Sequence, residues 1–289
     1  MKTTITPDNG DVLRYTAFSS DPAGGNPAGV VLDASALDDT ARLAVAAGLG
    51  YSETAFLTAP PEGLGEPGRA FTLRFFSPLA EVSFCGHATV ATAVALAERR
   101  GPGEFVFATA AGTIPVEVDE RLRATLTSVD PHTEEVPEAS LAEALSALNW
   151  QPEDLDPAFP VRIAYAGARH LILAAGTRTR LADLDYDFDS LATLMRAHDL
   201  TTVQLVWRES ETVFHVRDPF PVGGVVEDPA TGAAAAALGA YLREYGLVPT
   251  TARLTLHQGA DMGRPGLLGV ELREGDRRVR VTGTATRIG

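Results

Sequence analysis

Short apolar runs separated by turn residues fill most of this chain, and a few longer segments carry apolar residues at helical spacing. Apolar residues four positions apart predict a helix over residues 38–49, with Asp38 or Asp39 as its cap and Gly48 or Gly50 at its end. The other predicted helices span residues 88–100, 140–148, 191–198 and 231–245.

Strand patterns occupy most of the intervals between these helices. Gly24, Gly25 and Pro27 predict a loop before the second strand, and residues 131–137 are expected to be a linker. The predicted strands are residues 12–18, 29–32, 52–59, 71–76, 82–84, 105–109, 114–118, 124–127, 161–165, 171–174, 202–207, 213–216, 254–256, 269–272 and 278–282.

The two alanine-rich helices begin in segments of similar outline. The stretch VEDPATGAAAAALGAYL repeats the order of FFSPLAEVSFCGHATVATAVAL: polar residues, then A-T, then alanines, then leucine. Placing Thr89 on Thr231 also places Leu96 on Leu238 without a gap, and each helix is followed by a strand, a glycine turn and a strand. This pattern predicts two duplicated halves with one site between them.

Each half is rich in strands and has one long central helix, which predicts an α+β fold. We expect two pseudo-symmetric lobes, each a curved, mostly antiparallel sheet wrapped around its helix. The predicted domains are residues 1–128 and residues 129–289, with packing of the last strand back on the first lobe as one option.

Charge and composition narrow the functional classes. The chain has 289 residues and a net charge of −14, so its surface repels nucleic acids and anionic membranes. Its N-terminal segment lacks the apolar core of a signal peptide, and no run is long enough to span a bilayer. A single cysteine excludes an internal disulfide. We therefore expect a soluble, cytoplasmic globular protein.

Glu53 enters an otherwise apolar strand, in the sequence SETAFL. One interpretation is an exposed carboxylate at a strand end. The other is a half-buried carboxylate, whose pKa would rise and allow proton exchange near neutral pH.

His87 follows Gly86 near the start of a helix, where it either caps the helix or takes part in binding. A helix N-terminus favours anions and a neutral imidazole, so His87 and the neighbouring backbone N–H groups are able to bind a carboxylate or enolate. Asp228 stands at the matching turn of the second half, where capping the following helix, with Pro229 at its first position, explains the residue on its own.

Cys85 and His87 form a C-x-H pair. Because no further residue in the sequence clearly orients the histidine, we expect Cys85 to be a buried, inert residue rather than a nucleophile. Nucleotide-binding glycine motifs are absent, and the six histidines lack metal-ligand spacing. No metal or organic cofactor is expected.

The segments GNPAGVVLD, SETAFL, FFSPLAEVSFCGHATVATA, VEDPATGAA and QGADMGRP together resemble the PhzF family of phenazine-biosynthesis isomerase-like proteins, in the right order and over nearly the whole chain. The resemblance implies the two-lobed diaminopimelate epimerase fold, with the active site between the lobes. It also implies a cytoplasmic homodimer that uses no metal or organic cofactor.

Residue by residue, Glu53 matches the general acid/base glutamate of the family, His87 the histidine of its G-H-[PA]-T motif and Asp228 the aspartate of its D-P-x-T-G motif. Family members usually have serine where this chain has Ala233, which argues against the family's best-known substrate, a dihydro-hydroxyanthranilate. The residues expected to bind the substrate are Asn26, Ser52, Gly86, Ala88, Thr231, Gly232 and Ala233.

The resemblance favours a cofactor-independent isomerase of secondary metabolism, of the kind used in phenazine or other antibiotic biosynthesis. Glu53 would move a proton between two carbons of a small, carboxylated, conjugated substrate, while His87 and Asp228 hold its polar groups. Cys85 occupies the position of one catalytic cysteine of related epimerases, and no cysteine stands at the second position, where Glu227, Asp228 and Pro229 are expected.

Two alternatives remain open. One is an epimerase or racemase of an amino or imino acid, which would introduce solvent deuterium with inversion. The other is a small-molecule binding protein without catalytic activity, which the missing serine keeps in consideration.

Overall fold

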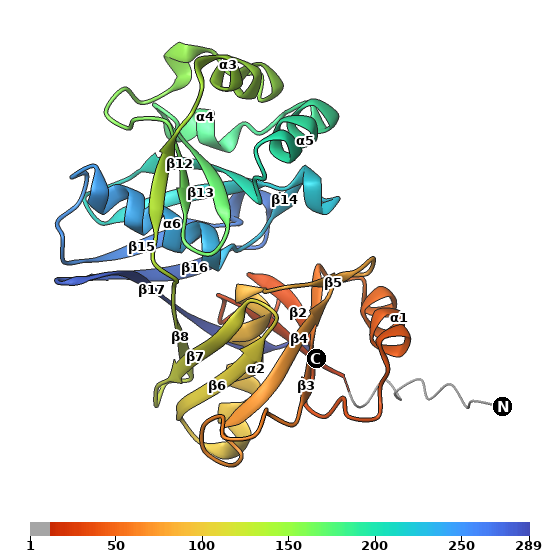
Figure 1. Cartoon of the computed structure of the whole chain (residues 1–289). Coiled ribbons are helices and arrows are strands. Elements are labelled where there is room, and N and C mark those ends of the chain that lie inside the picture. The colour runs from red at the N-terminus through yellow and green to blue at the C-terminus, as the bar shows by residue number, and fades with distance from the viewer. Residues whose placement is uncertain (1–11) are drawn as a thin grey trace. The chain divides into compact units, whose positions relative to one another are not determined.

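The computed structural model describes residues 12–289, so residues 1–11 of the N-terminal segment predicted to carry no signal peptide lie outside this range. The chain divides into two compact units, one running to Thr127 and including Thr282–Gly289, the other comprising Ser128–Val281. Each unit combines strands with helices, which confirms the α+β class (Figure 1). Among residues 12–289, no helix is long and apolar enough to cross a membrane.

The strands of the first unit form a sheet in the order β17–β1–β2–β3–β4–β6–β7–β8. Most neighbours are antiparallel, while β2–β3 and β4–β6 are parallel; β5 pairs with β4, and β8 also pairs with β17. The elements are β1 (Leu13–Ala17), β2 (Asn26–Val31), α1 (Asp39–Leu49), β3 (Glu53–Thr58), β4 (Ala70–Phe76), β5 (Glu81–Val82), α2 (Gly86–Arg100), β6 (Gly103–Thr109), β7 (Gly112–Val118), β8 (Arg123–Thr127) and β17 (Asp276–Arg287), which belongs to this unit from Thr282 onward.

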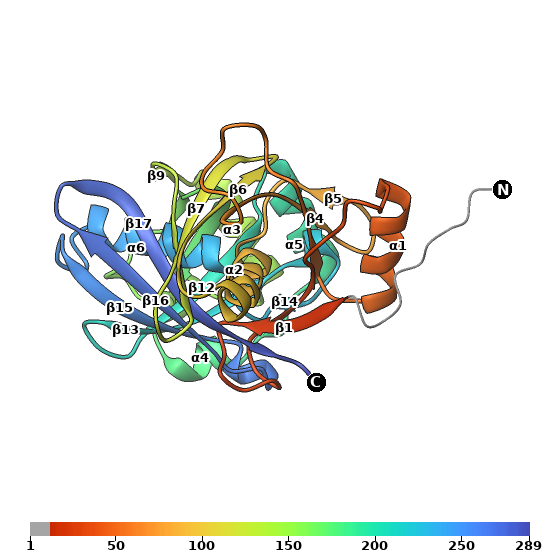
Figure 2. The same cartoon turned by 90° about the horizontal axis from the view of Figure 1, so that it is seen from below.

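The strands of this unit enclose α2 (Figures 1 and 2). Every residue from His87 to Ala97 is buried, and the helix contacts β1, β2, β3, β7 and β8. Its residues are mostly alanine, valine and threonine, so strands can approach the helix closely on several sides. The small side chains explain why a helix of this composition is the centre of the unit.

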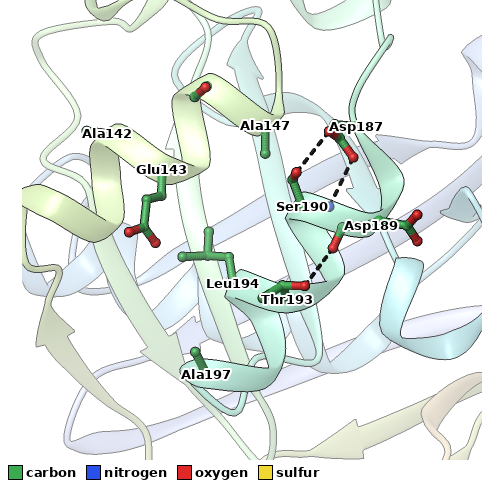
Figure 3. A pocket seen from close by; sticks show the side chains of 10 residues that line it. Ala142, Glu143, Ala147, Asp187, Asp189, Ser190, Thr193, Leu194 and Ala197 are labelled. Atoms are coloured by element: carbon green, nitrogen blue, oxygen red, sulfur yellow. Dashed lines mark hydrogen bonds between the residues drawn. The ribbon is translucent and has the colours of Figure 1, made fainter.

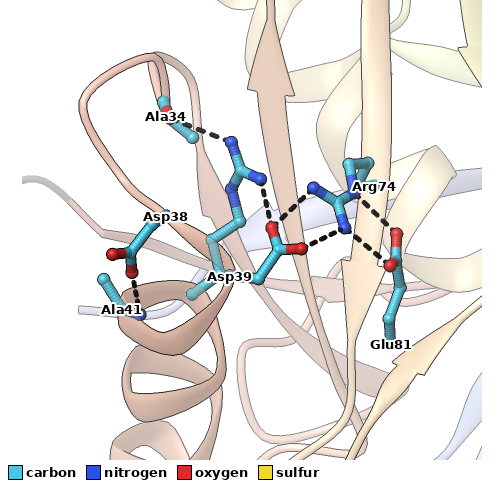
Figure 4. Close-up of polar contacts among 7 residues, drawn as sticks. Ala34, Asp38, Asp39, Ala41, Arg74 and Glu81 are labelled. Atoms are coloured by element: carbon cyan, nitrogen blue, oxygen red, sulfur yellow. Dashed lines mark hydrogen bonds and ion pairs between the residues drawn. The ribbon is translucent and has the colours of Figure 1, made fainter.

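Helix α1 lies at the edge of the first unit and is attached by charged groups. Asp38 accepts the N–H of Ala41 at 2.9 Å, and Gly50 ends the helix in the left-handed conformation. Of the alternatives predicted for this helix, Asp38 is therefore the cap and Gly50 the end. Arg74 on β4 binds Asp39 at 2.7 Å and Glu81 on β5 at 2.6 Å (Figure 4). This one arginine therefore joins α1 and β5 to the sheet.

The second unit has strands in the order β9–β10–β11–β12–β13–β15–β16, with β14 paired to β13. Helix α6 packs against β9, β10, β11 and β16, while α3, α4 and α5 join a separate apolar cluster around Trp150. The elements are β9 (His132–Glu135), α3 (Glu138–Ala147), η1 (Pro152–Asp154), β10 (Arg162–Tyr165), β11 (Arg169–Ala174), α4 (Arg178–Ala182), α5 (Phe188–Ala197), β12 (Thr202–Arg208), β13 (Val213–Pro219), η2 (Pro221–Gly223), β14 (Glu227–Asp228), α6 (Gly232–Glu244), β15 (Ala252–Gln258), η3 (Ala260–Met262) and β16 (Gly266–Arg273).

Several element boundaries differ from the sequence predictions. The predicted linker 131–137 contains β9, which pairs with β10. Strand β2 begins at Asn26, so Pro27 lies in a strand; its pairing with β3 starts only at Ala28, and the missing N–H of the proline is therefore not needed there. Helix α5 begins at Phe188 because Asp187 caps it, and α4 was not predicted.

The starts of the two central helices differ from the predicted repeat alignment by four residues. Cys85 is the N-cap of α2 and Thr231 is the N-cap of α6, and each is followed by glycine. By position at the helix start, Cys85 corresponds to Thr231, whereas the alignment of Thr89 with Thr231 places it opposite Glu227. A shift of about four residues keeps the same helix faces in register, which is why the sequence pattern did not reveal it.

Candidate functional site

Glu53 is the first residue of β3 and pairs with Ala28 of the parallel strand β2. The following strand residues are buried, and the Glu53 side chain is 15 % exposed. Burial raises the pKa of this carboxyl above its ordinary value, although hydrogen bonds with Ser52 and Cys85 act in the opposite direction. Of the two sequence interpretations of Glu53, the half-buried carboxylate is correct.

The start of α2 presents Cys85, Gly86 and His87 close to this carboxylate. Cys85 has an extended backbone, and its carbonyl accepts the N–H of Thr89 at 3.1 Å and the Thr89 hydroxyl at 2.7 Å. The helix therefore begins at Gly86, two residues earlier than predicted. Its first N–H groups lie before the intrahelical hydrogen bonds and carry the positive end of the helix dipole.

His87 is buried and is held by polar groups from three directions. Its Nδ1 lies 3.2 Å from Asn26 Nδ2, and its Nε2 lies 3.3 Å from Ser52 Oγ and 3.4 Å from Glu53 Oε2. An amide nitrogen only donates, so Nδ1 accepts in this arrangement and the proton of a neutral imidazole is on Nε2. His87 is thereby oriented with its N–H toward the hydroxyl and the carboxylate.

Cys85 takes part in the same cluster. Its thiol donates to Glu53 Oε2 at 3.5 Å, and its Sγ lies 3.3 Å from His87 Nδ1. The expectation that nothing orients the histidine is wrong, because Asn26 and Ser52 do so from separate segments. Cys85 is buried, as expected, and its thiol contacts both polar residues of the cluster; its inertness stays a prediction.

The second unit carries its own polar turn at the start of α6. Asp228 ends the two-residue strand β14 and is buried; its Oδ2 accepts the Thr231 hydroxyl at 2.6 Å. The prediction that Asp228 caps the helix with Pro229 at the first helical position is wrong, because Thr231 is the N-cap and Gly232 the first residue. The carboxylate of Asp228 instead accepts a hydrogen bond from the hydroxyl of Thr231, the N-cap residue.

Gln258 fixes this turn and was not among the predicted site residues. Its Oε1 accepts the Thr231 N–H at 2.9 Å, and its Nε2 donates to the Asp228 carbonyl at 2.9 Å. The next residue, Gly259, has φ +78°, and a Cβ there would lie 2.7 Å from the Pro229 carbonyl oxygen. The Q-G pair of QGADMGRP is the sequence signal that could have indicated this support of the turn.

Polar contacts of Glu227 and Asp218 stabilise the strand segment that carries Asp228. Glu227 forms a buried ion pair with Arg217, at 2.5 Å between Oε2 and Nη2. Asp218, which pairs with Asp228 between β13 and β14, is fully buried, and burial raises its pKa well above the usual value. The Thr202 hydroxyl donates to Asp218 at 2.8 Å. The strand that carries Asp228 is thus fixed by polar contacts within its own unit.

The predicted site residues form two groups. One group surrounds Glu53 in the first unit, and the other surrounds Asp228 in the second. The first contains Asn26, Ser52, Glu53, Gly86, His87 and Ala88, and the second contains Asp228, Thr231, Gly232 and Ala233.

A hollow of about 790 Å³ lies between α3 and α5 in the second unit (Figure 3). It is lined by small and acidic residues, and it contains none of the predicted site residues. The hydrogen bonds drawn there are local to α5, such as Asp187 with Ser190. Local helix capping explains these polar groups, so we do not assign substrate binding to this hollow.

Three similarities to known proteins bear on this site. The family model for phenazine biosynthesis-like proteins, PhzC-PhzF, matches residues 15–288. An uncharacterized isomerase of Bacillus subtilis, YfhB, is 32% identical over 292 residues, covering 95% of each chain. Trans-2,3-dihydro-3-hydroxyanthranilate isomerase of Pseudomonas chlororaphis is 30% identical over 262 residues, covering 87% of this chain and 86% of the relative.

The fold has a close counterpart among solved structures. The PhzF-family phenazine biosynthesis protein of Bacillus anthracis superposes with a TM-score of 0.84, covers 96% of each chain and is 24% identical. This likeness confirms the predicted fold of two similar lobes. On the match over residues 15–288, the chain belongs to the PhzC-PhzF family of phenazine biosynthesis-like proteins, an enzyme family whose curated relatives are named isomerases.

Proposed function

We propose that this protein is a cofactor-independent isomerase in which Glu53 moves a proton between two carbons of a small, carboxylated, conjugated substrate. One observation carries the proposal: a carboxylate with a raised pKa lies at the start of β3, 3.4 Å from a buried histidine and 3.5 Å from a thiol. A carboxyl of raised pKa is better suited than an ordinary exposed carboxylate to accept a proton and later return it.

His87 would act on the charge that develops in the substrate. In the neutral form set by Asn26, its Nε2–H is a donor directed to the region of Ser52 and Glu53. A donor already held in place needs little reorganisation when a substrate oxygen becomes enolate-like. The N–H groups at the start of α2, including those of Gly86 and Ala88, suit a substrate carboxylate.

For the second unit we propose that Asp228 holds a polar group of the substrate and that the N–H groups of Gly232 and Ala233 bind a carboxylate. This is supported by the N-terminal position of both residues in α6, a helix of 13 residues. Ala233 supplies no hydroxyl, so the substrate need not be that of the Pseudomonas chlororaphis relative. We propose a related class, carboxylated cyclic dienes or imines, within secondary metabolism such as antibiotic biosynthesis.

The experiment is a screen of such compounds for proton exchange in heavy water, followed by NMR. We expect deuterium at one carbon together with loss of a proton at another carbon of the same molecule. The matched control is Glu53→Gln, which keeps the shape of the side chain and removes its acid/base function. Exchange that persists unchanged in Glu53→Gln would remove Glu53 from the mechanism.

The epimerase alternative has one specific observation in its favour, the contact of Cys85 with Glu53 and His87. Inversion through a planar carbanion needs a base on each face, and the chain has a single cysteine, at the N-cap of α2, whereas the N-cap of α6 is Thr231. A two-cysteine racemase is therefore excluded. Deuterium entering one α-carbon with inversion would favour an epimerase of another kind, and ligand stabilisation without exchange would favour a binding protein. The homodimer, the cytoplasmic location and the independence from cofactors stay predictions.

A further inference from the structure

A row of buried polar side chains crosses the sheet of the second unit and ends next to Asp228. This polar row consists of His170 on β11, Thr202 on β12 and Asp218 on β13, each at most 1% exposed. His170 pairs with Thr202 in register, and Asp218 pairs with Asp228 on β14. His170 Nδ1 lies 2.8 Å from Thr202 Oγ1, which lies 2.8 Å from Asp218 Oδ1. The row therefore joins the interior of the unit to the strand that carries Asp228.

The hydrogen bonds of the polar row determine the form of His170. A hydroxyl has one proton, and Thr202 donates it to Asp218, so the bond with His170 uses the Nδ1–H of the ring. The ring Nε2 has no hydrogen-bond partner among residues 12–289. Burial lowers the pKa of His170 to about 3, because the interior disfavours the charged ring. The imidazole is therefore neutral and brings no positive charge to Asp218.

Asp218 forms no ion pair within the described part of the chain. Arg217 precedes it on β13, and successive side chains of a strand point to opposite faces of the sheet. The guanidinium of Arg217 donates to both carboxylate oxygens of Glu227 and to the Ala182 carbonyl. The cation next in sequence is thus fully engaged elsewhere, and Asp218 is a buried carboxyl without a counter-charge.

A charged Asp218 is strongly disfavoured in these surroundings. Burial raises the pKa of Asp218 well above its ordinary value, and the charges of Asp228 and Glu227 raise it further. The hydrogen bond from Thr202 acts in the opposite direction, while Oδ2 of Asp218 has no hydrogen-bond partner among the described residues. The Gln204 amide lies close enough to lower this pKa, yet neither of its polar atoms makes a hydrogen bond of good geometry within residues 12–289. The neutral acid is therefore the favoured form of Asp218.

We propose that the polar row is a positioning element for Asp228, in which Asp218 is the uncharged member of the carboxyl pair. Residues directly opposite each other on antiparallel strands project to the same face of the sheet, so two charged carboxylates here would repel each other at short range. A neutral Asp218 leaves Asp228 undisturbed in its hydrogen bond from the Thr231 hydroxyl. The protonation of Asp218 stands by itself, whereas its effect on the substrate rests on the proposed function.

The protonation is tested on the full chain by infrared difference spectroscopy at neutral pH. We expect the spectrum of the wild type minus that of Asp218→Asn to show the carbonyl stretching band of a protonated carboxyl group. Asp276→Asn is the matched control, because hydrogen bonds from Arg278 lower the pKa of this second aspartate. For the control we expect carboxylate bands. Carboxylate bands in place of the carbonyl band for Asp218→Asn would overturn the inference.

The positioning effect is tested by kinetics on a substrate found in the heavy-water screen. Asn is uncharged and keeps an acceptor for the Thr202 hydroxyl, so we expect KM and kcat of Asp218→Asn within about twofold of the wild type. Asp218→Ala removes this acceptor, and Thr202→Val removes the hydroxyl with little change of shape. We expect both to raise KM about tenfold, the equivalent of one hydrogen bond between Asp228 and the substrate, with kcat within about twofold.

Circular dichroism checks that each variant is folded. If Asp218→Ala does not fold, Thr202→Val carries the kinetic test, because it retains the volume of the side chain. An unchanged KM in the folded variants, or an Asp218→Asn variant as impaired as they are, would overturn the positioning effect.

Failure of this inference and failure of the proposed function give different results. Turnover that persists in Glu53→Gln refutes the proton-transfer role and leaves the infrared result unaffected. A raised KM that Asp218→Asn does not share, together with the carbonyl band of a protonated Asp218, supports the inference.

Discussion

The ion pair between Arg217 and Glu227 gives a quantitative test of how the Asp228 turn is held. Arg217 donates from Nε to Glu227 Oε1 at 3.0 Å and from Nη2 to Oε2 at 2.5 Å. The two side chains are only 9% and 3% exposed. Removing one partner of a buried pair leaves a desolvated charge and destabilises a protein by about 3–5 kcal/mol. Glu227→Gln keeps one acceptor, and Arg217 also donates to the Ala182 carbonyl at 2.7 Å, so we expect about 3 kcal/mol.

Tryptophan fluorescence during urea unfolding measures this effect selectively. The two tryptophans, Trp150 and Trp207, both belong to the second unit, so their signal follows the unit that contains the ion pair. The double variant Arg217→Met with Glu227→Leu removes both charges, and it is expected to recover most of the loss.

Arg253→Met is the surface control for the ion pair. The Arg253 side chain is 87% exposed and 3.5 Å from Glu271, so its loss is expected to be below about 1 kcal/mol. A loss below about 1 kcal/mol in Glu227→Gln would refute the reasoning, because a buried guanidinium that has lost its carboxylate partner should be strongly destabilising. A double variant as unstable as the sum of the single variants would refute it as well.

Three further predictions follow from individual contacts. Gly259→Ala places a Cβ at φ +78° and 2.3 Å from the Arg264 carbonyl oxygen, so it should destabilise the second unit by about 2 kcal/mol or more in the urea experiment. The control Gly263→Ala has a similar φ of +75° but no neighbour within 4 Å of its Cβ, so its loss of stability should be smaller. Cys85→Ala removes a hydrogen bond that lowers the pKa of Glu53, so the pH profile of turnover should move to higher pH; an unchanged profile contradicts this. The pKa of Glu53 is raised in the folded state, so the native state binds this proton more tightly than the unfolded chain does. The resulting stabilisation is present below the unfolded-state pKa and is lost as pH rises through the folded-state pKa. Above this window Glu53→Gln should therefore be more stable than the wild type, and thermal melts that show no gain contradict the prediction.

Much of the fold could be predicted from periodicity, because burial follows the apolar pattern in both central helices. Boundaries were less predictable where a polar contact decides them. Asp187 accepts the N–H of Ser190, and this cap starts α5 earlier than its apolar pattern indicates. The polar segment His132–Glu135 forms a strand because it pairs with β10. Such partners are distant in sequence or depend on one side chain, so periodicity does not contain them.

The candidate site, too, could be predicted only in part from the sequence. Glu53, His87 and Asp228 were identified through motifs, whereas the contacts among their neighbours required the structure. Cys85 contacts Glu53 on β3, and Gln258 contacts Asp228 before α6. Both contacts join residues that are distant in sequence, so the sequence pattern does not reveal them. The two central helices start four residues off the predicted repeat alignment, and because a shift of four residues preserves the helix face, the alanine pattern alone does not reveal this difference.

The most direct test of the central claim separates binding from turnover in Glu53→Gln. Turnover of a substrate found in the heavy-water screen is compared with the dissociation constant of a stable analogue of it, for variant and wild type. We predict a loss of turnover of at least about 100-fold, the lower bound for general acid–base catalysis, with the dissociation constant within about twofold. Turnover near that of the wild type in Glu53→Gln would contradict the assignment of Glu53 as the residue that carries the proton.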